Sequence, residues 1–395
     1  MQSEVKSTFW FQYEKRKMKE CADTLHNLAS AFLIEENDEE DKDRQNLFYK
    51  KRIKENRVLM ADHLKEMAAI IENVIEEKVK IICLPGKQEK MLAKALSMEG
   101  LILEEFSILE KGNGKKEFLA RLYQNNISVK KKYYTSEEVA EFLSVFLNLK
   151  LVPSLNTPFF IGNTSENYCF EEDACYMVLT GYAKTTKEGE KISGDNFAFF
   201  ESGDKKFYAI LSDGMGSGEK ACKDSEEVIE MAEKFLEGGL SDVTTAKMMN
   251  DSLLAKGEGK NMSTLDICSV DLYTGQAGFL KVGATYGLLK RDGYVEKIPS
   301  ISLPLGVFHD MEMNQYKKNL LDGDYIFLFS DGILDHFYGD HGEQILKELV
   351  AQMPYKRPSE MASHIMKLAL STSQGKVKDD TTVLVIGIWE NSKMR

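Results

Sequence analysis

Apolar residues in the second half of the chain come in short runs bounded by glycine, asparagine and aspartate. Runs of about four to eight such residues are typical of buried strands. They predict strands at 176–184, 196–201, 206–211, 265–271, 278–283, 286–291, 325–330 and 382–389. Between them, helical periodicity predicts helices at 219–236, 242–256, 342–352 and 359–371. Two helices inserted between runs of mostly antiparallel strands predict a sandwich of sheets flanked by helices.

The N-terminal part of the chain follows a helical period. Two long helices are predicted at 3–34 and 45–80, joined by an acidic link at 35–43. Apolar residues recur along the second helix at steps of three, four or seven, and we name them the seam: Ile53, Met60, Leu64, Met67, Ile71 and Val74. Such a pattern is typical of a coiled coil, and equally of a long helix lying on its own domain. We expect the seam to pack either on a second copy, which gives a homodimer through 45–80, or near the helix at 219–236.

A small βαβ-like unit follows the long helix. Its predicted strands are 79–84, 102–109 and 117–123, and its first helix is 87–99. A second helix, ending at Leu147, has Thr135 or Ser136 with Glu138 as its N-terminal cap. The unit carries no catalytic constellation, so we expect a regulatory or structural role. The expected organisation is a helical region at 1–78, a small α/β regulatory unit at 79–160 and a strand-rich domain at 161–395.

Composition and charge narrow the class of protein. The 395 residues are 43% hydrophobic and 29% charged, with a formal net charge of −12. This balance is ordinary for a soluble globular chain, and the acidic excess argues against a nucleic-acid or anionic-membrane partner. The six cysteines include no closely spaced pair and are typical of reduced thiols in a cytoplasmic protein. No run of eighteen apolar residues occurs, so we expect no membrane span in this chain.

Four acidic residues stand next to glycine or at the edge of an apolar run: Asp195, Asp213, Asp331 and Asp379. Carboxylates at one spot repel each other unless a cation lies between them, and oxygen ligands select magnesium or manganese over zinc. Gly214, which lacks a Cβ, could add its carbonyl oxygen. Two other interpretations remain open. Asp-Gly pairs are common in turns, and glycines alternate from Gly214 to Gly218 somewhat as in a phosphate-binding loop.

Several motifs stand in the order known from one family. They are Ser193-Gly194-Asp195, LSDGMGSGEKA at 211–221, STLD at 263–266, DLYTG at 271–275, KVGA at 281–284, LPLGV at 303–307, Ser330-Asp331-Gly332 and DDTTV at 379–383. Together they resemble the PPM-type, protein phosphatase 2C-like serine/threonine phosphatases, and most of all the bacterial stage II sporulation protein E family. The resemblance covers about residues 165–391. It implies an α+β fold: a PPM-type β-sandwich flanked by helices at 161–395, preceded by a long regulatory helix and a small α/β unit.

The resemblance also implies a catalytic site with two Mn²⁺ or Mg²⁺ ions. Asp213 would bridge the two ions, and Gly214 would offer its carbonyl. Asp331 and Asp379 would hold one ion, and Asp195 would order the site directly or through water. A metal-bridging hydroxide would attack phosphoserine or phosphothreonine on an anti-sigma factor antagonist, which would activate a sigma factor in sporulation. Helices beginning near Ser217 and Asp242 would be a switch that completes metal binding.

Two departures from the family pattern change the expectation. Many PPM phosphatases have a histidine directly after the Asp-Gly pair to protonate the leaving group, whereas this chain has Met215. His309, His336 and His341 are alternative acids that the sequence does not place. The multi-span membrane segment of the sporulation family is missing, so we expect a cytoplasmic protein or the cytoplasmic part of a membrane-anchored one. The alternative function is a catalytically weak pseudophosphatase scaffold that binds a signalling partner.

Overall fold

The computed structural model describes the residues in the following ranges: 2–33, 44–76, 80–111, 115–125, 133–154, 157–256, 262–300, 303–307, 313–337, 342–354, 356–373 and 375–391. The described chain forms two compact units. One contains residues 2–27 and 65–174, and the other contains residues 28–64 and 175–391. No helix in these ranges is both long and apolar enough to cross a membrane.

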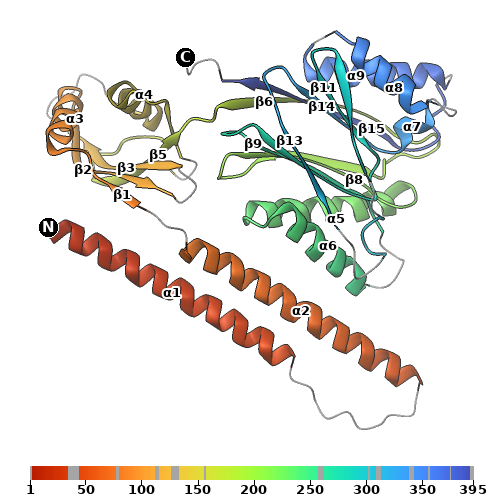
Figure 1. Ribbon diagram of the computed structural model, residues 1–395, viewed down its shortest axis with the longest axis horizontal. Helices are drawn as coiled ribbons and strands as arrows, with labels where there is room; N and C mark the ends of the chain where they lie inside the picture. Colours follow the sequence, from red (N-terminus) through yellow and green to blue (C-terminus); the bar gives the residue numbers. More distant parts are fainter. Residues whose placement is uncertain are drawn as a thin grey trace. The chain divides into compact units, whose positions relative to one another are not determined.

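The two predicted N-terminal helices are present as α1 (Gln2–Phe32) and α2 (Arg44–Glu76). His26 Nε2 of α1 lies 3.2 Å from Glu72 Oε1 of α2, so the helices lie side by side at this point (Figure 1). The predicted acidic link lies outside the described residues. Nearer the middle of α2, His63 Nε2 lies 3.6 Å from Asp251 Oδ2 of helix α6 (Asp242–Lys256).

The seam is not the part of α2 that is buried. Ile53, Met60 and Met67 are 54%, 49% and 41% exposed, and Val74 has no described side chain. The fully buried apolar side chains of the two helices are instead small: Ala22, Ala29, Ala61 and Ala68. The prediction that the seam packs within the chain is therefore wrong for Ile53, Met60 and Met67. That a second copy of the chain packs on the seam stays a prediction.

The first unit contains one five-stranded sheet of order β1-β2-β3-β5-β4. Its elements are β1 (Lys80–Ile82), α3 (Gly86–Met98), β2 (Leu101–Glu110), β3 (Lys116–Gln124), α4 (Ser136–Leu147), β4 (Leu151–Pro153) and β5 (Glu166–Glu172). Thr135 and Glu138 form the predicted capping box of α4. Strands β1 and β2 pair antiparallel, so the unit lacks the parallel crossover of a true βαβ motif.

The pairing of strand β5 differs from the expected division of the chain into three regions. The division at 1–78, 79–160 and 161–395 stays a prediction. That division places β5 in the C-terminal domain, whereas the strand pairs with β3 and β4 of the small sheet.

The second unit contains two five-stranded sheets, with strand orders β13-β10-β9-β8-β7 and β12-β11-β14-β15-β6. The strands are β6 (Tyr176–Thr185), β7 (Asp195–Glu201), β8 (Lys206–Asp213), β9 (Leu265–Asp271), β10 (Gln276–Val282), β11 (Gly287–Arg291), β12 (Tyr294–Ile298), β13 (Gln315–Asn319), β14 (Tyr325–Phe329) and β15 (Thr381–Glu390). The helices are α5 (Gly218–Glu237), α6, α7 (Gly332–Asp335), α8 (Gly342–Gln352) and α9 (Pro358–Thr372). Every pairing within these sheets is antiparallel.

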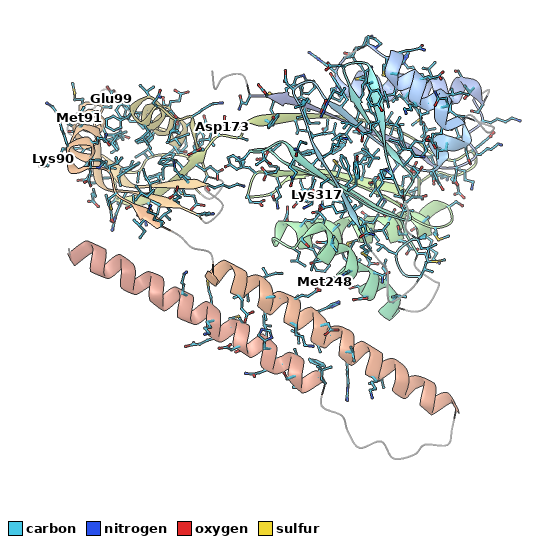
Figure 2. The ribbon with its side chains drawn as sticks, viewed as in Figure 1. Lys90, Met91, Glu99, Asp173, Met248 and Lys317 are labelled. Carbon is cyan, nitrogen blue, oxygen red and sulfur yellow. The ribbon has the colours of Figure 1, made fainter. Side chains whose placement is uncertain are left out.

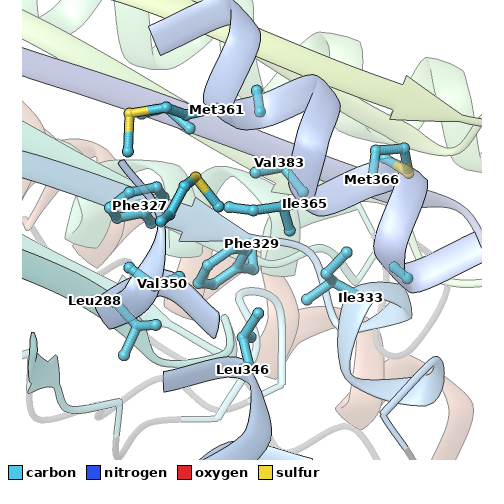
Figure 3. Packing of buried hydrophobic residues seen from close by; sticks show 14 of the residues in the cluster. Leu288, Phe327, Phe329, Ile333, Leu346, Val350, Met361, Ile365, Met366 and Val383 are labelled. Carbon is cyan, nitrogen blue, oxygen red and sulfur yellow. The ribbon is translucent and has the colours of Figure 1, made fainter. Parts of the chain in front are cut away.

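Helices flank both sheets, as the sequence predicts. On one side, α8 and α9 pack on β11, β14 and β15 through a buried cluster that includes Phe327, Ile365 and Val383 (Figure 3). On the other side, α5 and α6 pack on β8, β9 and β10 through a cluster that includes Ile210, Val228 and Met249. Met248 of α6 is also buried (Figure 2). The chain thus has the expected α+β architecture.

Candidate active site

Two of the four predicted acidic residues face each other across neighbouring strands. Asp195 is the first residue of β7 and Asp213 is the last residue of β8, and the two are direct partners in the antiparallel register. Asp195 is fully buried, and neither of its carboxylate oxygens has a hydrogen-bond partner. Asp213 is half-buried, and its N–H donates to Thr264 Oγ1 at 2.9 Å. The end of this sheet therefore presents two adjacent carboxylates.

The other two predicted residues lie at the corresponding end of the second sheet. Asp331 follows the last residues of β14, and Asp379 stands just before β15. The Ser330 N–H donates to the Thr382 carbonyl at 3.0 Å, which ties the end of β14 to the start of β15. A cavity of about 20 Å³ lies between these two sheet ends and is lined by residues from both sheets. It is lined by Leu211, Asp213, Thr264, Asp266, Gly283, Ala284, Thr285, Phe329, Ser330 and Asp331.

Asp380 is a member of the site that the sequence reasoning missed. It is 4% exposed, and its carboxylate accepts hydrogen bonds from the N–H of Lys187 at 2.9 Å and of Gly194 at 2.7 Å. These bonds tie the loop before Asp195 to the start of β15. The available signal was the doubled aspartate at 379–380, since two adjacent acidic residues seldom share one role.

Gly214 lets helix α5 approach the acidic site closely. A Cβ at this position would lie 2.0 Å from the Ala221 carbonyl oxygen, so only glycine fits without a shift of the helix. The Gly214 N–H donates to the Gly194 carbonyl at 3.2 Å, and Ser225 Oγ of α5 donates to the same oxygen. The backbone next to Asp195 and Asp213 is thereby packed directly against α5.

The carboxylates perturb each other strongly. Burial, together with the charges of Asp195 and Asp331, raises the pKa of Asp213 to about 9. Burial also raises the pKa of Asp195 to about 6, and the charges of Asp380 and Asp331 act in the same direction. Burial and Asp379 raise the pKa of Asp331. A cation among these residues would remove the repulsion.

The donor set suits a hard divalent ion. All the acidic groups offer oxygen, which Mg²⁺ and Mn²⁺ prefer, and the two unpartnered oxygens of Asp195 lack any compensating donor. Within the described residues, however, no three histidine, cysteine or acidic side chains already stand together as a ligand group. Metal binding would therefore require the carboxylates to converge.

His336 is the one candidate acid among the described residues, and two hydroxyl groups engage its ring. It is buried behind the site, where its Nδ1 pairs with Ser373 Oγ at 2.8 Å and its Nε2 with Thr381 Oγ1 at 3.3 Å. His309 and His341 lie outside the described residues. Met215 is 51% exposed at the position after the Asp-Gly pair. Lys187 Nζ lies 3.7 Å from Asp379 Oδ1, so a cationic side chain stands at the rim.

Comparison with known proteins agrees with the fold. Residues 203–389 match the family model described as stage II sporulation protein E. Over 349 residues the chain is 28% identical to stage II sporulation protein E of Bacillus subtilis strain 168, an alignment that covers 88% of this chain. The chain spans 41% of the length of that relative.

Two solved structures from Bacillus subtilis are similar to this chain. One is the PP2C phosphatase domain of SpoIIE with a fragment of its regulatory domain, with a TM-score of 0.64 and 26% sequence identity. The alignment covers 88% of this chain and 97% of the SpoIIE chain. The other is the phosphatase domain of SpoIIE alone, with 31% sequence identity and a TM-score of 0.47. This alignment covers 56% of this chain and 96% of the SpoIIE chain.

The two-sheet fold with acidic strand ends defines a PPM-type, protein phosphatase 2C-like domain. The family model and the sequence identities then narrow the class. The matched family model and the 28% identity over 349 residues place the chain close to stage II sporulation protein E among these phosphatases. PP2C-family phosphatases depend on divalent metal ions.

Proposed function

We propose that this chain is a metal-dependent protein serine/threonine phosphatase whose substrate is a phosphorylated anti-sigma factor antagonist. The observation that carries the proposal is the convergence of Asp213 and Asp331, from two different sheets, on one cavity beside the unpartnered carboxylate of Asp195. Membership of a phosphatase family supports the same reaction. The anti-sigma factor antagonist, and a role in sporulation, follow from the family resemblance.

In this proposal each acidic residue has a defined part. Asp213, with the Gly214 carbonyl beside it, would contribute to holding both Mn²⁺ or Mg²⁺ ions, and Asp331 and Asp379 would hold one of them. Asp195 orders the site directly or through water. When bound, the ions would lower the pKa of a water molecule and neutralise the phosphate.

Helix α5 is suited to act as the switch that completes the site. Because Gly214 lies directly against Ala221, a shift of α5 would move the backbone that carries Asp213. The absence of a ready ligand group among the described residues fits a site that must close before it binds metal. The neighbouring helix α6 contacts α5 and would move with it.

The proposal is tested by hydrolysis of an aryl phosphate and a phosphoserine peptide with Mn²⁺, with and without a chelator. Asp213→Asn, Asp331→Asn and Asp379→Asn should each lower turnover by orders of magnitude, since each removes a ligand charge. The matched control is Asp335→Asn, an exposed aspartate on α7 four residues after Asp331, which should keep normal turnover. Normal turnover in the three ligand variants would refute the dimetal site. A folded wild type that binds a phosphoprotein but never hydrolyses it would indicate the scaffold function instead.

A further inference from the structure

A buried ion pair lies beneath the acidic site and has no part in the mechanism described so far. Asp266 of β9 and Lys281 of β10 are cross-strand partners, and the Lys281 ammonium donates to Asp266 Oδ2. Their side chains are 0% and 2% exposed. Both residues therefore lie within the sandwich, where apolar side chains would be expected.

Stability does not explain this pair. Taking two charges out of water costs free energy that their mutual attraction repays only with good geometry. Replacing such a pair by apolar residues of similar volume is often neutral or stabilising. The arrangement here is also incomplete, because Asp266 Oδ1 is buried and has no hydrogen-bond partner. A carboxylate oxygen left in that state points to a ligand that completes it.

The position of Asp266 indicates what that ligand is. Asp266 lines the same cavity as Asp213 and Asp331, and Thr264 and Ser330 add further polar walls. The cavity volume of about 20 Å³ is enough for one water molecule. A buried water needs two to four polar partners, which these residues provide.

We propose that Asp266, held in place by Lys281, is a positioning residue of the metal site: its Oδ1 accepts one hydrogen bond from a buried water, which donates its second hydrogen to the carboxylate of Asp213. The water thereby fixes the orientation of the Asp213 carboxylate. Lys281 donates to the other oxygen, Oδ2, and so holds Asp266 Oδ1 toward the cavity. This inference rests on the proposed function, since it concerns the residues proposed to hold the metal ions.

The test removes both charges together. The double variant Asp266→Leu/Lys281→Met leaves no unpaired buried charge, so the metal-free protein should unfold at the wild-type temperature or higher. Its affinity for Mn²⁺, measured by calorimetric titration, should fall about 10- to 100-fold, the usual loss when a group that orients metal ligands is removed. Unchanged Mn²⁺ affinity in the folded double variant would overturn the inference.

The matched control is a second ion pair, which lies in the other sheet at the end of β14 away from the acidic site and has a buried carboxylate. Arg291 Nε donates to Asp324 Oδ1 at 2.8 Å, and Asp324 is 1% exposed. Asp324 precedes β14, whereas Asp331 follows it. The variant Arg291→Met/Asp324→Leu should therefore keep wild-type Mn²⁺ affinity, whatever its stability. An equal loss of affinity in this control would also overturn the inference, because the effect would then be a general one of losing a buried pair.

A second measurement does not depend on any variant. A crystal structure of the wild-type protein should show ordered water within hydrogen-bond distance of Asp266 Oδ1. An empty cavity, in a map that shows ordered solvent elsewhere in the core, would refute the positioning role. Failure of the proposed function gives a different result, because the wild type itself would then bind no Mn²⁺ and hydrolyse no phosphate.

Discussion

The Asp380 carboxylate accepts a hydrogen bond of 2.7 Å from the Gly194 N–H, a residue 186 positions earlier in the chain. A second bond, from the Lys187 N–H, reaches the other oxygen of the same carboxylate. One side chain directly before β15 thus fixes the loop that precedes Asp195. Asp380 itself has both oxygens engaged by the backbone, which distinguishes its role from that of Asp195.

We predict that Asp380→Asn weakens Mn²⁺ binding about 10- to 100-fold. An amide offers one acceptor oxygen and turns a donor toward the second N–H, so one of the two loop bonds is lost. Mn²⁺ titration monitored by calorimetry measures the change. The control is Asp322→Asn, because Asp322 Oδ1 accepts from the Glu390 N–H at 2.8 Å at the far end of β15. Equal Mn²⁺ affinities in the two variants would contradict the role of Asp380.

The raised pKa values of Asp195 and Asp213 predict how the metal-free protein responds to pH. A carboxyl group whose pKa is higher in the folded state than in the unfolded state stabilises the fold while protonated, and this contribution is lost as pH rises through the folded pKa. The pKa of Asp195 is raised to about 6 and that of Asp213 to about 9. Stability in chelator should therefore fall as pH rises from about 4 to about 9.

Asp213→Asn tests this prediction, because an amide is uncharged at every pH and spares the folded state the cost of protonating or ionising this carboxyl. In chelator at pH 8, the variant should unfold at least about 2 °C above the wild type, the shift that 1 kcal/mol produces in a domain of this size. Mn²⁺ should stabilise the wild type at pH 8 far more than the variant. A wild-type unfolding temperature that rises with pH in chelator would show that the carboxylates do not repel each other as inferred.

Gly214→Ala should uncouple the acidic site from helix α5. The added methyl would lie 2.0 Å from the Ala221 carbonyl oxygen, so the helix must shift away. We expect a weaker Mn²⁺ affinity and a loss of stability of about 1–3 kcal/mol, the usual cost of overpacking. Gly86→Ala is the control, since a Cβ there has no heavy atom within 4 Å. If Gly214→Ala behaved like Gly86→Ala in both measurements, the close approach of α5 would be irrelevant to the site.

The sequence predicted the fold most accurately where the hydrophobic pattern is local and strong. The apolar run of β14 and the switch to helical periodicity in α5 lie close to their predicted bounds. Strand β13 was missed because its sequence, QYKKN, is mostly polar at the edge of a sheet. Strand β12, YVEKI, was missed for a similar reason, since it too lies at an edge.

The residues of the site also differ in how far the sequence alone predicts them. The four predicted aspartates carry a local signal, an acidic residue at a strand end, and the structure places them at the ends of β7, β8, β14 and β15. The roles of Asp380 and Asp266 depend instead on partners elsewhere in the chain, such as Gly194 and Lys281, which a local pattern does not reveal. Only the three-dimensional pairing of the strands brings these groups together.

The last prediction concerns α2, where residues of the seam are exposed and the neighbouring alanines are buried. Met67 is 41% exposed, whereas the adjacent Ala68 is fully buried. A lysine at Ala68 must place its charge in a packed contact, so Ala68→Lys should lower stability by about 2 kcal/mol or more. A lysine at Met67 can reach water in a single copy and should leave monomer stability unchanged.

Met67→Lys therefore tests for the second copy on the seam. If a homodimer forms there, this variant should dissociate it in sedimentation experiments and raise the Mn²⁺ concentration needed for half-maximal activity. A coupling of about 1–3 kcal/mol corresponds to a shift of about 5- to 150-fold. The maximal rate should change less than this midpoint, because the seam is proposed to bias the switch and not the chemistry. A wild type that sediments as a monomer, with superimposable Mn²⁺ curves for wild type and variant, would leave the seam without a regulatory role.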